Sequence, residues 1–319
     1  MTNSVSSRVP FALSKLSPAD VCAIVVTYNP DDSSVACVRT IVDAAVHTII
    51  VDNCSSEPCR QKLRELKSEK VTLIENSSNL GVAAGHNLGV RTAAEQGYEW
   101  FLLFDQDTKI FPLTIPNLIQ VYADCFSEIG PKLGMLGSNY YHMMEDGTIV
   151  EAKVPLCHGR QWSEAELIIT SGTLISRENF DQIGPFREDF FIDHVDHDYC
   201  LKARHHGFVI ARTALPLMIH RLGMLCTKRP WLALGRKKLL SFYSPLRRYY
   251  QLRNFLLLAH EYEHEFPKSI NFIRRSIRKE TQRALKYEGH FFRNLMSVIL
   301  ALQHSRRGIT GKYIGRIAL

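Results

Sequence analysis

Two carboxylates stand where they can bind one metal ion. Asp105 and Asp107 flank Gln106 directly after the apolar run 100–104. In an extended chain, side chains two positions apart lie on the same side, so both carboxylates can reach one ligand. Hard oxygen donors suit Mg²⁺ or Mn²⁺, and such an ion can bridge to a diphosphate. We therefore expect a metal-dependent site here, and the alternative is a solvated acidic loop.

A second group of acids lies in segment 190–198, Phe-Phe-Ile-Asp-His-Val-Asp-His-Asp. Asp196 shares a predicted helix face with the residues three, four and seven positions later, and that face is mostly apolar. A half-buried carboxylate can act as general base towards an acceptor hydroxyl. Asp198 and Asp193 are the next candidates for this base. The alternatives are a helix cap for Asp193 with Asp196, and a surface ion pair with Lys202 for Asp198.

Strands and helices alternate around these residues. Short apolar, β-branched runs predict strands over 21–27, 48–51, 71–75 and 100–104, and the segments between them predict helices from 31, over 57–67 and over 83–96. Such alternation predicts a parallel sheet with helices on both faces, and ligands bind beyond the carboxyl ends of its strands. The polar residues that follow these strands, and that we expect to bind a nucleotide, are Thr27, Tyr28, Asn29, Asp52, Asn53, Asn79, Asp105 and Gln106.

Small residues are concentrated in segment 79–89, Asn-Leu-Gly-Val-Ala-Ala-Gly-His-Asn-Leu-Gly, where the third helix should begin. Small residues let a ligand or another part of the backbone approach closely. We include Gly81 and Asn87 among the nucleotide-binding candidates. The segment contains neither a Gly-x-Gly-x-x-Gly fingerprint nor a P-loop, and close packing of the glycines is the alternative.

Further candidates lie outside these segments. His220 ends the apolar run 215–219 and can complete a metal site with the two aspartates, although a lone histidine is often structural. Segment 247–254 mixes arginine and tyrosine, and arginine can hold phosphate through two parallel hydrogen bonds. A helix with a solvated basic face is the alternative. The candidates for binding the acceptor or a phosphate are Ser171, Gly172, Arg247, Arg248, Tyr249 and Arg253.

The pattern after residue 133 is mixed. We predict strands over 133–138, 167–176, 208–210 and 217–219, helices over 177–183 and from about 194 to 206, and mostly helix beyond 241. The domains that we predict are a disordered arm over 1–19, a nucleotide-binding catalytic domain over 20–225 and a basic helical region over 226–319.

Charge separates the last two parts. The net charge is +7 over 319 residues, but it is +16 from Arg221 onwards and −9 before that residue. A basic segment can meet nucleic acid, anionic lipid or a phosphorylated acceptor. We exclude nucleic acid because the chain has no recognised nucleic-acid-binding module. The eight cysteines form no Cys-x-x-Cys pair, and no apolar run is long enough for a signal peptide or a membrane span.

Together these motifs resemble the family 2 inverting glycosyltransferases, which have the GT-A fold. The matching strings, in the family's order, are Val-Val-Thr-Tyr-Asn-Pro at 25–30, Val-Asp-Asn at 51–53, segment 79–89, Asp-Gln-Asp at 105–107 and segment 190–204. The Asp-Gln-Asp string, the Phe-Ile-Asp-x-Val-Asp string and segment 244–254 are most similar to the bacterial rhamnosyltransferase branch. The resemblance implies an α/β GT-A domain, Rossmann-like with a mostly parallel sheet, followed by a helical appendage.

The resemblance also implies roles for individual residues. The residues that would hold the thymine or uracil base are Thr27, Tyr28, Asn29 and Asp52. Asp105 would lie near the ribose and the metal, and Asp107 would bind the divalent ion together with His220. Asp196 corresponds to the second acid of the family's Glu-Asp motif, which is usually assigned as the base. Val195 stands where that motif often has glutamate.

The implied reaction is a single displacement in which dTDP-β-L-rhamnose would give an α-L-rhamnoside. Acceptors in this branch are often lipid-linked glycans of O-antigen or other cell-wall polysaccharides. Other donors, such as a UDP-hexose, UDP-galactofuranose or a GDP-sugar, and a non-catalytic nucleotide- or polysaccharide-binding relative, are the alternatives.

The basic C-terminal third is suited to an anionic membrane, which attracts each basic residue near its surface by about 1 kcal/mol. We therefore expect a cytoplasmic protein that is peripheral at the inner face of the plasma membrane. A homo-oligomeric interface is the alternative use of amphipathic segments such as 291–303.

Overall fold

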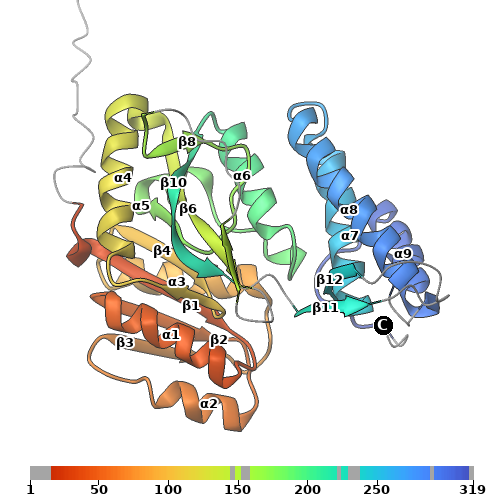
Figure 1. Ribbon diagram of the computed structural model, residues 1–319, viewed down its shortest axis with the longest axis horizontal. Coiled ribbons are helices and arrows are strands. Elements are labelled where there is room, and N and C mark those ends of the chain that lie inside the picture. The colour runs from red at the N-terminus through yellow and green to blue at the C-terminus, as the bar shows by residue number, and fades with distance from the viewer. Residues whose placement is uncertain are drawn as a thin grey trace, which may run out of the picture.

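The computed structural model describes residues 16–143, 148–151, 159–220, 224–228, 238–287 and 291–315. Most of the arm predicted over 1–19 lies outside these residues, but Pro18–Asp20 forms a short 3-10 helix, η1. A domain built on a curled sheet and a group of three long helices lie side by side (Figure 1).

Four parallel strands form one half of the main sheet, as the alternation predicted. Their order is β3-β2-β1-β4. Their bounds are β1 Val21–Thr27, β2 His47–Asp52, β3 Val71–Glu75 and β4 Trp100–Asp105. The helices between them are α1 Asp32–Ala44, α2 Glu57–Arg64 and α3 Val82–Glu95. Alternate residues of β1 pack on opposite sides, Ile24 against α3 and Val25 against α1 and α2, which is why the whole strand is apolar.

The other half of the sheet is mixed. Beyond β4 the order continues β9-β6-β10-β5, where β9 is antiparallel to both β4 and β6 and β10 is parallel to β6. The bounds are β5 Thr108–Ile110, β6 Leu133–Met143, β9 Thr173–Ser176 and β10 Val209–His220. Two short strands at its margin are β7 Ile149–Glu151 and β8 Trp162–Glu164. The helical segments are α4 Thr114–Ile129, η2 Gly130–Lys132, α5 Arg177–Ile183, η3 Glu188–Phe190 and α6 Val195–His205.

This half differs from the predicted elements in several places. Only 173–176 of the strand predicted over 167–176 is extended in the sheet, because the chain turns at Gly172, which has a φ of +76°. The two strands predicted over 208–210 and 217–219 are one strand, β10, whose register shifts around Pro216, a residue that cannot donate a ladder hydrogen bond. The structure also contains α4 and the strands β5, β7 and β8, which were not predicted.

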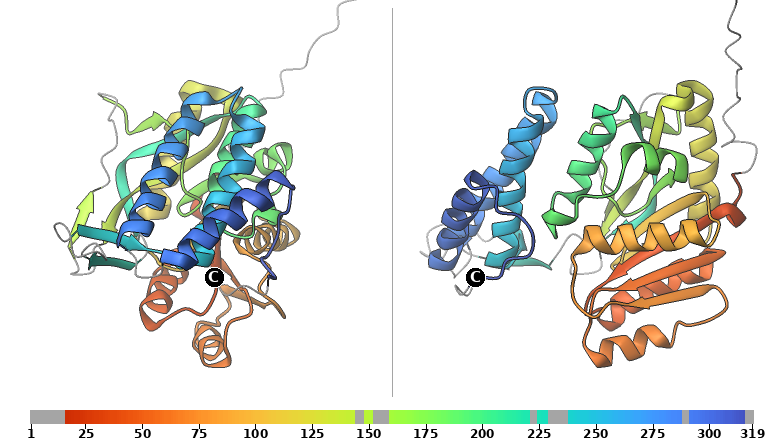
Figure 2. Two further views of the ribbon diagram at one scale, coloured as in Figure 1. Left: turned by 90° about the vertical axis from the view of Figure 1, so that its right-hand side faces the viewer. Right: turned by 180° about the vertical axis from the view of Figure 1, so that it is seen from behind.

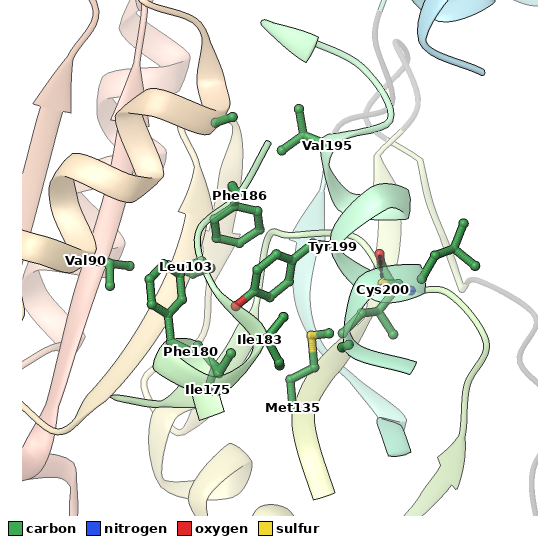
Figure 3. Close-up of a cluster of buried hydrophobic side chains, with 14 of the residues drawn as sticks. Val90, Leu103, Met135, Ile175, Phe180, Ile183, Phe186, Val195, Tyr199 and Cys200 are labelled. Carbon is green, nitrogen blue, oxygen red and sulfur yellow. Dashed lines mark hydrogen bonds between the residues drawn. The ribbon is translucent and has the colours of Figure 1, made fainter. Parts of the chain in front are cut away.

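Helix α6 is anchored in the core by its apolar face. The ring of Tyr199 stacks on Phe186 with centroids 4.0 Å apart, and Cys200 contacts the backbone carbonyl of Ile168 through its sulfur. Figure 3 shows Tyr199 and Cys200 among the buried side chains of the sheet and of α5. Since this face is fixed in the core, the orientation of the acidic residues at the start of α6 is fixed as well.

The C-terminal region packs as a layer beside the sheet domain (Figure 2). Its helices are α7 Pro245–Tyr262, α8 Pro267–Tyr287 and α9 Phe291–Arg306, and a hairpin of β11 Met224–Lys228 and β12 Lys238–Phe242 precedes them. The predicted domain boundary between 225 and 226 therefore lies inside β11. Within the described residues, no helix has the length and apolar character that crossing a membrane requires.

Candidate active site

A cleft of about 780 Å³ opens at the carboxyl ends of β1 and β4. The turn before α6 and the helices α7 and α8 form its other walls. Its volume lies in the range of pockets that bind small molecules and cofactors. The two acidic clusters found in the sequence both face this space, since Asp105, Asp107, Asp193 and Asp196 line it.

Asp105, Asp107 and His220 form a candidate cation site at the floor of the cleft. Their ligand atoms all lie within 4.8 Å of one another, and His220 Nδ1 is 3.5 Å from Asp107 Oδ1. Two carboxylates and an imidazole are a donor set that fits a divalent ion. Burial raises the pKa of Asp105 to about 6, with the nearby His220 opposing this shift. A bound cation would favour the ionised form of that carboxylate.

Hydrogen bonds beneath the floor hold this group in place. The backbone N–H of Asp105 donates to Ser171 Oγ at 3.1 Å, and Ser171 Oγ lies 2.7 Å from Thr108 Oγ1. Thr108 Oγ1 is in turn 2.9 Å from His220 Nδ1. Ser171 is fully buried and does not line the cleft. It supports the site from below, which differs from the acceptor or phosphate role predicted for it.

Several predicted nucleotide-binding residues also line the cleft. They are Thr27, Tyr28, Asn53, Asn79, Gly81 and Gln106. Gln106 holds the loop after β1, because its Oε1 accepts from the backbone N–H of Tyr28 at 2.7 Å and its Nε2 donates to the Tyr28 carbonyl at 3.3 Å. Asn79 Oδ1 accepts from the N–H of Gly81 at 2.9 Å and so shapes the turn that opens α3.

Asp52 and Asn29 are not among the residues that line the cleft. Asp52 is completely buried and accepts hydrogen bonds from Thr27 Oγ1 at 3.2 Å and from the Ser55 N–H at 2.9 Å. Asn29 Oδ1 accepts from the Ser56 N–H at 2.8 Å. Both residues therefore join the loops after β1 and β2, and the Asp52 carboxylate contacts the cleft lining through Thr27.

The acids at the start of α6 have different surroundings. Asp196 is half-buried and lines the cleft, and its Oδ1 accepts from the backbone N–H of His197 at 2.8 Å. Asp193 also lines the cleft, where Nε of Arg247 lies 3.2 Å from its Oδ2. Burial raises the pKa of Asp193, and Arg247 opposes the shift. Arg247 lines the cleft too, so this ion pair faces any bound ligand.

Asp198 does not face the cleft. Its side chain is 4% exposed and lies 3.5 Å from Arg187, which also pairs with Asp189 and Glu261. Burial raises the pKa of Asp198 to about 6, while Arg187 opposes the shift. Asp198 therefore points away from the cleft, because α6 turns its side chain towards Arg187 and α7.

Other predicted ligands also lie outside the cleft. Asn87 is buried and connects α3 to the segment before η3, since its amide donates to the Phe186 carbonyl at 2.9 Å and its Oδ1 accepts from the Phe186 N–H. Gly172 is enclosed by Ser138 and Met218. In this structure neither Asn87 nor Gly172 lines the cleft, and both contact other parts of the protein.

Three of the four basic-aromatic candidates are also turned away. Arg248 packs against the ring of Tyr243 and reaches the backbone carbonyl of Glu280 on α8. Tyr249 is buried against α9, where its hydroxyl lies 2.7 Å from Nδ1 of His304. Arg253 is fully buried. Of this group only Arg247 lines the cleft, because successive residues of α7 point in different directions.

Residues 22–149 match the protein-family model described as Glycosyl transferase family 2. This chain contains a family 2 glycosyltransferase domain. The glycosyltransferase is 28% identical over 299 residues to the dTDP-rhamnosyl transferase RfbF of Shigella flexneri. This alignment covers 92% of this chain and 97% of the relative. It is 23% identical over 211 residues to the low-salt glycan biosynthesis hexosyltransferase Agl10 of Haloferax volcanii, which covers 63% of this chain and 67% of the relative.

The fold of the glycosyltransferase also resembles a solved structure. The crystal structure of S. aureus TarS 1-349 in complex with UDP-GlcNAc aligns with a TM-score of 0.50 at 14% identity, covering 91% of this chain and 81% of that chain. The mixed sheet flanked by helices, the matched domain and the C-terminal helices agree with the GT-A fold that the sequence motifs implied.

Other residues that line the cleft of the glycosyltransferase were not predicted. They include Tyr140 on β6, Thr170, His194, His197, Gln251 on α7, and Phe272, Ile273, Ser276, Ile277 and Glu280 on α8. The members on α8 recur at helical spacing, so the sequence shows that they share one face. It does not show which domain that face meets, because this depends on how α8 packs in three dimensions.

Proposed function

We propose that this glycosyltransferase moves L-rhamnose from dTDP-β-L-rhamnose to a glycan acceptor. The observation that carries the choice of donor is the match to the dTDP-rhamnosyl transferase RfbF over nearly the full length of both chains. A match of this extent includes the turn before α6 and helix α7, which carry residues that line the cleft. The hexosyltransferase relative makes a hexose donor the second candidate.

The pyrimidine base would lie against the end of β1 and the loop that follows it. Thr27 and Tyr28 would bind it, and Asp52 would act through its hydrogen bond to Thr27 Oγ1. Gln106 keeps this loop in shape by holding the backbone of Tyr28. Arg247 faces the same cleft, so its guanidinium would bind the diphosphate. Arginine can donate two parallel hydrogen bonds to a phosphate group.

Asp107, His220 and Asp105 would hold Mg²⁺ or Mn²⁺ beside the diphosphate. When bound, such an ion stabilises the negative charge that develops on the departing nucleotide. His220 is held towards this site by Thr108, so one metal ligand is fixed by a buried hydrogen bond. A hydrogen bond of this kind orients a metal ligand and tunes its affinity for the metal.

Asp196 is the proposed general base. Its carboxylate takes the proton from the acceptor hydroxyl, and the hydroxyl oxygen forms a bond to the anomeric carbon. The bond from that carbon to the diphosphate oxygen breaks, and the nucleotide diphosphate leaves with the electron pair. Attack from the face opposite the leaving group inverts the configuration, so a β-L-rhamnosyl donor gives an α-L-rhamnoside. The hydrogen bond from the His197 N–H fixes one oxygen of Asp196 and leaves the other for the acceptor.

We further propose a cytoplasmic enzyme whose C-terminal region contacts the anionic inner face of the plasma membrane, where a lipid-linked glycan acceptor would lie. Helix α8 exposes a row of basic side chains, namely Arg275, Arg278, Lys279, Arg283 and Lys286. On α9, Phe292 is 82% exposed and shares a face with Leu295 and Ile299. Flotation with anionic vesicles at low salt tests this proposal. Failure to float, with a dimer in solution, would support the competing subunit interface.

Binding selectivity tests the donor. Titrations of the full chain with dTDP-rhamnose, UDP-glucose, UDP-galactose and GDP-mannose, each in Mn²⁺, should give the tightest binding for dTDP-rhamnose. A pocket that hydrogen-bonds its own sugar nucleotide discriminates strongly against analogues that leave its polar groups unpaired. Preference for a UDP-hexose would replace the rhamnosyl assignment, and binding of none of the four would favour a non-catalytic role.

A further inference from the structure

The turn that leads into α6 has an unusual backbone. Phe191, Asp193 and His194 have φ values of 64°, 63° and 62°, and none of them is glycine. Side chains disfavour this left-handed region, so such residues persist where the surrounding structure fixes them, and they cluster at functional sites. This turn brings Asp193 to the cleft, and the helix that it starts carries Asp196.

The side-chain amide of Asn254, on α7, binds three backbone carbonyls of the turn. Its amide nitrogen lies 2.9 Å from the carbonyl oxygen of Phe190, 2.8 Å from that of Ile192 and 2.9 Å from that of Asp193. The side chain is completely buried, so no water competes for these hydrogen bonds. Three carbonyls converging on one amide leave little freedom for the backbone between 190 and 193.

Arg253 contacts the segment just before the turn. One terminal nitrogen of its guanidinium lies 3.4 Å from the Asp189 carbonyl and 3.3 Å from the Phe190 carbonyl, and the other donates to the Gly311 carbonyl at 2.7 Å. Nε donates to Asn254 Oδ1 at 2.9 Å and so orients the amide that holds the turn. The guanidinium is fully buried.

Aromatic packing completes the arrangement. The ring of Tyr250, one helical turn before Asn254, stacks on Phe191 with centroids 5.4 Å apart. The Phe191 carbonyl accepts from the N–H of Val82 at 2.8 Å, at the first residue of α3. The turn is therefore fixed by α7 on one side and by the start of the nucleotide-side helix on the other.

We propose that Arg253 and Asn254 are positioning residues that fix the turn 190–194 and thereby set Asp193 and Asp196 towards the reacting atoms. This inference rests on the proposed role of Asp196 as base. It gives the C-terminal helical region a part in building the catalytic site, beyond any contact with membrane or a second subunit. The simpler alternative is that the pair only stabilises the packing of α7.

A matched variant separates the two explanations. Asn179 is also a buried asparagine whose amide donates to two backbone carbonyls, those of Leu133 and Gly134 at 2.8 Å each, and it lies away from the cleft. Asn254→Ala should lower kcat for transfer from dTDP-rhamnose by about 100-fold, because a displacement of about 1 Å at a catalytic group has such an effect. The Kd for dTDP should change less than about twofold in both variants, and kcat of Asn179→Ala should stay within about twofold of wild type.

Two further measurements keep the test decisive. Arg253→Lys keeps the charge but loses the planar fork, so it should lower kcat less than Asn254→Ala does and still leave dTDP binding intact. Backbone hydrogen exchange in 190–196 should rise in Asn254→Ala and stay at the wild-type level in Asn179→Ala, whatever sugar the enzyme transfers. Equal kcat and equal exchange in the two asparagine variants would overturn the inference. If wild type did not transfer from dTDP-rhamnose, but Asn254→Ala still showed faster exchange in 190–196 than Asn179→Ala, only the proposed function would be contradicted.

Discussion

His220 Nδ1 lies 3.5 Å from Asp107 Oδ1 because β10 pairs with the short strand β5. In this antiparallel register His220 is the partner of Thr108, the residue directly after Asp107. Backbone pairing, and not a loose loop, therefore brings the histidine to the two aspartates. A site that is preorganised in this way can hold a cation without further movement of the backbone.

Removing a metal ligand should reduce both metal affinity and turnover. We expect Asp107→Asn and His220→Ala to weaken Mn²⁺ binding and to lower kcat for donor turnover by about 100-fold or more, since lost stabilisation of transition-state charge has effects of this size. Titration of Mn²⁺ and initial rates of dTDP release measure the two quantities. Asp43→Asn, at an exposed position on α1, is the control and should match wild type. Unchanged Mn²⁺ affinity in both ligand variants would contradict the site.

Replacement of the proposed base should affect chemistry more than binding. Asp196→Asn is isosteric but cannot take a proton, so kcat should fall by about 10²–10⁴-fold while the Kd for the nucleotide stays near that of wild type. Asp198→Asn on the same helix should leave kcat within about threefold, because its side chain faces Arg187. If the two variants lost kcat equally, or if Asp198→Asn lost more, the assignment of the base to Asp196 would be wrong.

Asp198 should also make stability depend on pH. Burial raises its folded-state pKa to about 6 from 3.8, so the folded protein holds this proton more tightly than the unfolded chain does. Its contribution to stability is present below pH ~4 and is lost as the pH rises through ~6. Urea unfolding of wild type and Asp198→Asn at pH 4.5 and 7.5 measures this. The free energy of unfolding of wild type, relative to the variant, should fall by roughly 1–3 kcal/mol over that range. A constant difference would contradict it.

Gly81 permits a close approach that no other residue allows. Its φ is +91°, and a Cβ atom there would lie 2.5 Å from the carbonyl oxygen of Phe191. Gly97 has a similar φ of +88°, but nothing lies within 4 Å of the position of its Cβ. Gly81→Ala should therefore lower the free energy of unfolding by about 1–3 kcal/mol more than Gly97→Ala does, because it adds a clash to the same backbone strain. Equal losses in urea unfolding would show that the turn at Phe191 yields freely.

The parallel half of the sheet could be predicted because its signals are local. The strand over 21–27 has the observed bounds, since a strand buried on both faces reads as one continuous apolar run. Helix α4 was missed although Ile115, Leu118 and Tyr122 recur at helical spacing. The merging of two predicted strands into β10 is less visible, because Pro216 and the residues before it look like a break between strands.

The acidic residues of the cleft could be predicted, but the surroundings of the basic-aromatic stretch could not. Asp105, Asp107 and Asp196 follow from strand ends and from the apolar face of α6. Arg253 resembles a solvated helix residue in the sequence, and the backbone carbonyls that converge on it help to make burial of its charge tolerable. Those carbonyls belong to segments far away along the chain, so no local pattern shows them.

The most direct test of the proposed reaction is the rate at which dTDP is released from dTDP-rhamnose by the purified full chain, with Mn²⁺ and then with excess chelator. Water can replace the unknown acceptor in this slow reaction, so no glycan is required. We predict that dTDP release depends on the metal and is faster than the release of UDP from UDP-glucose. We also predict that dTDP release is lost in both Asp107→Asn and Asp196→Asn. Release that continues unchanged under chelation, or in both variants, would contradict the assignment of the cleft as the catalytic site.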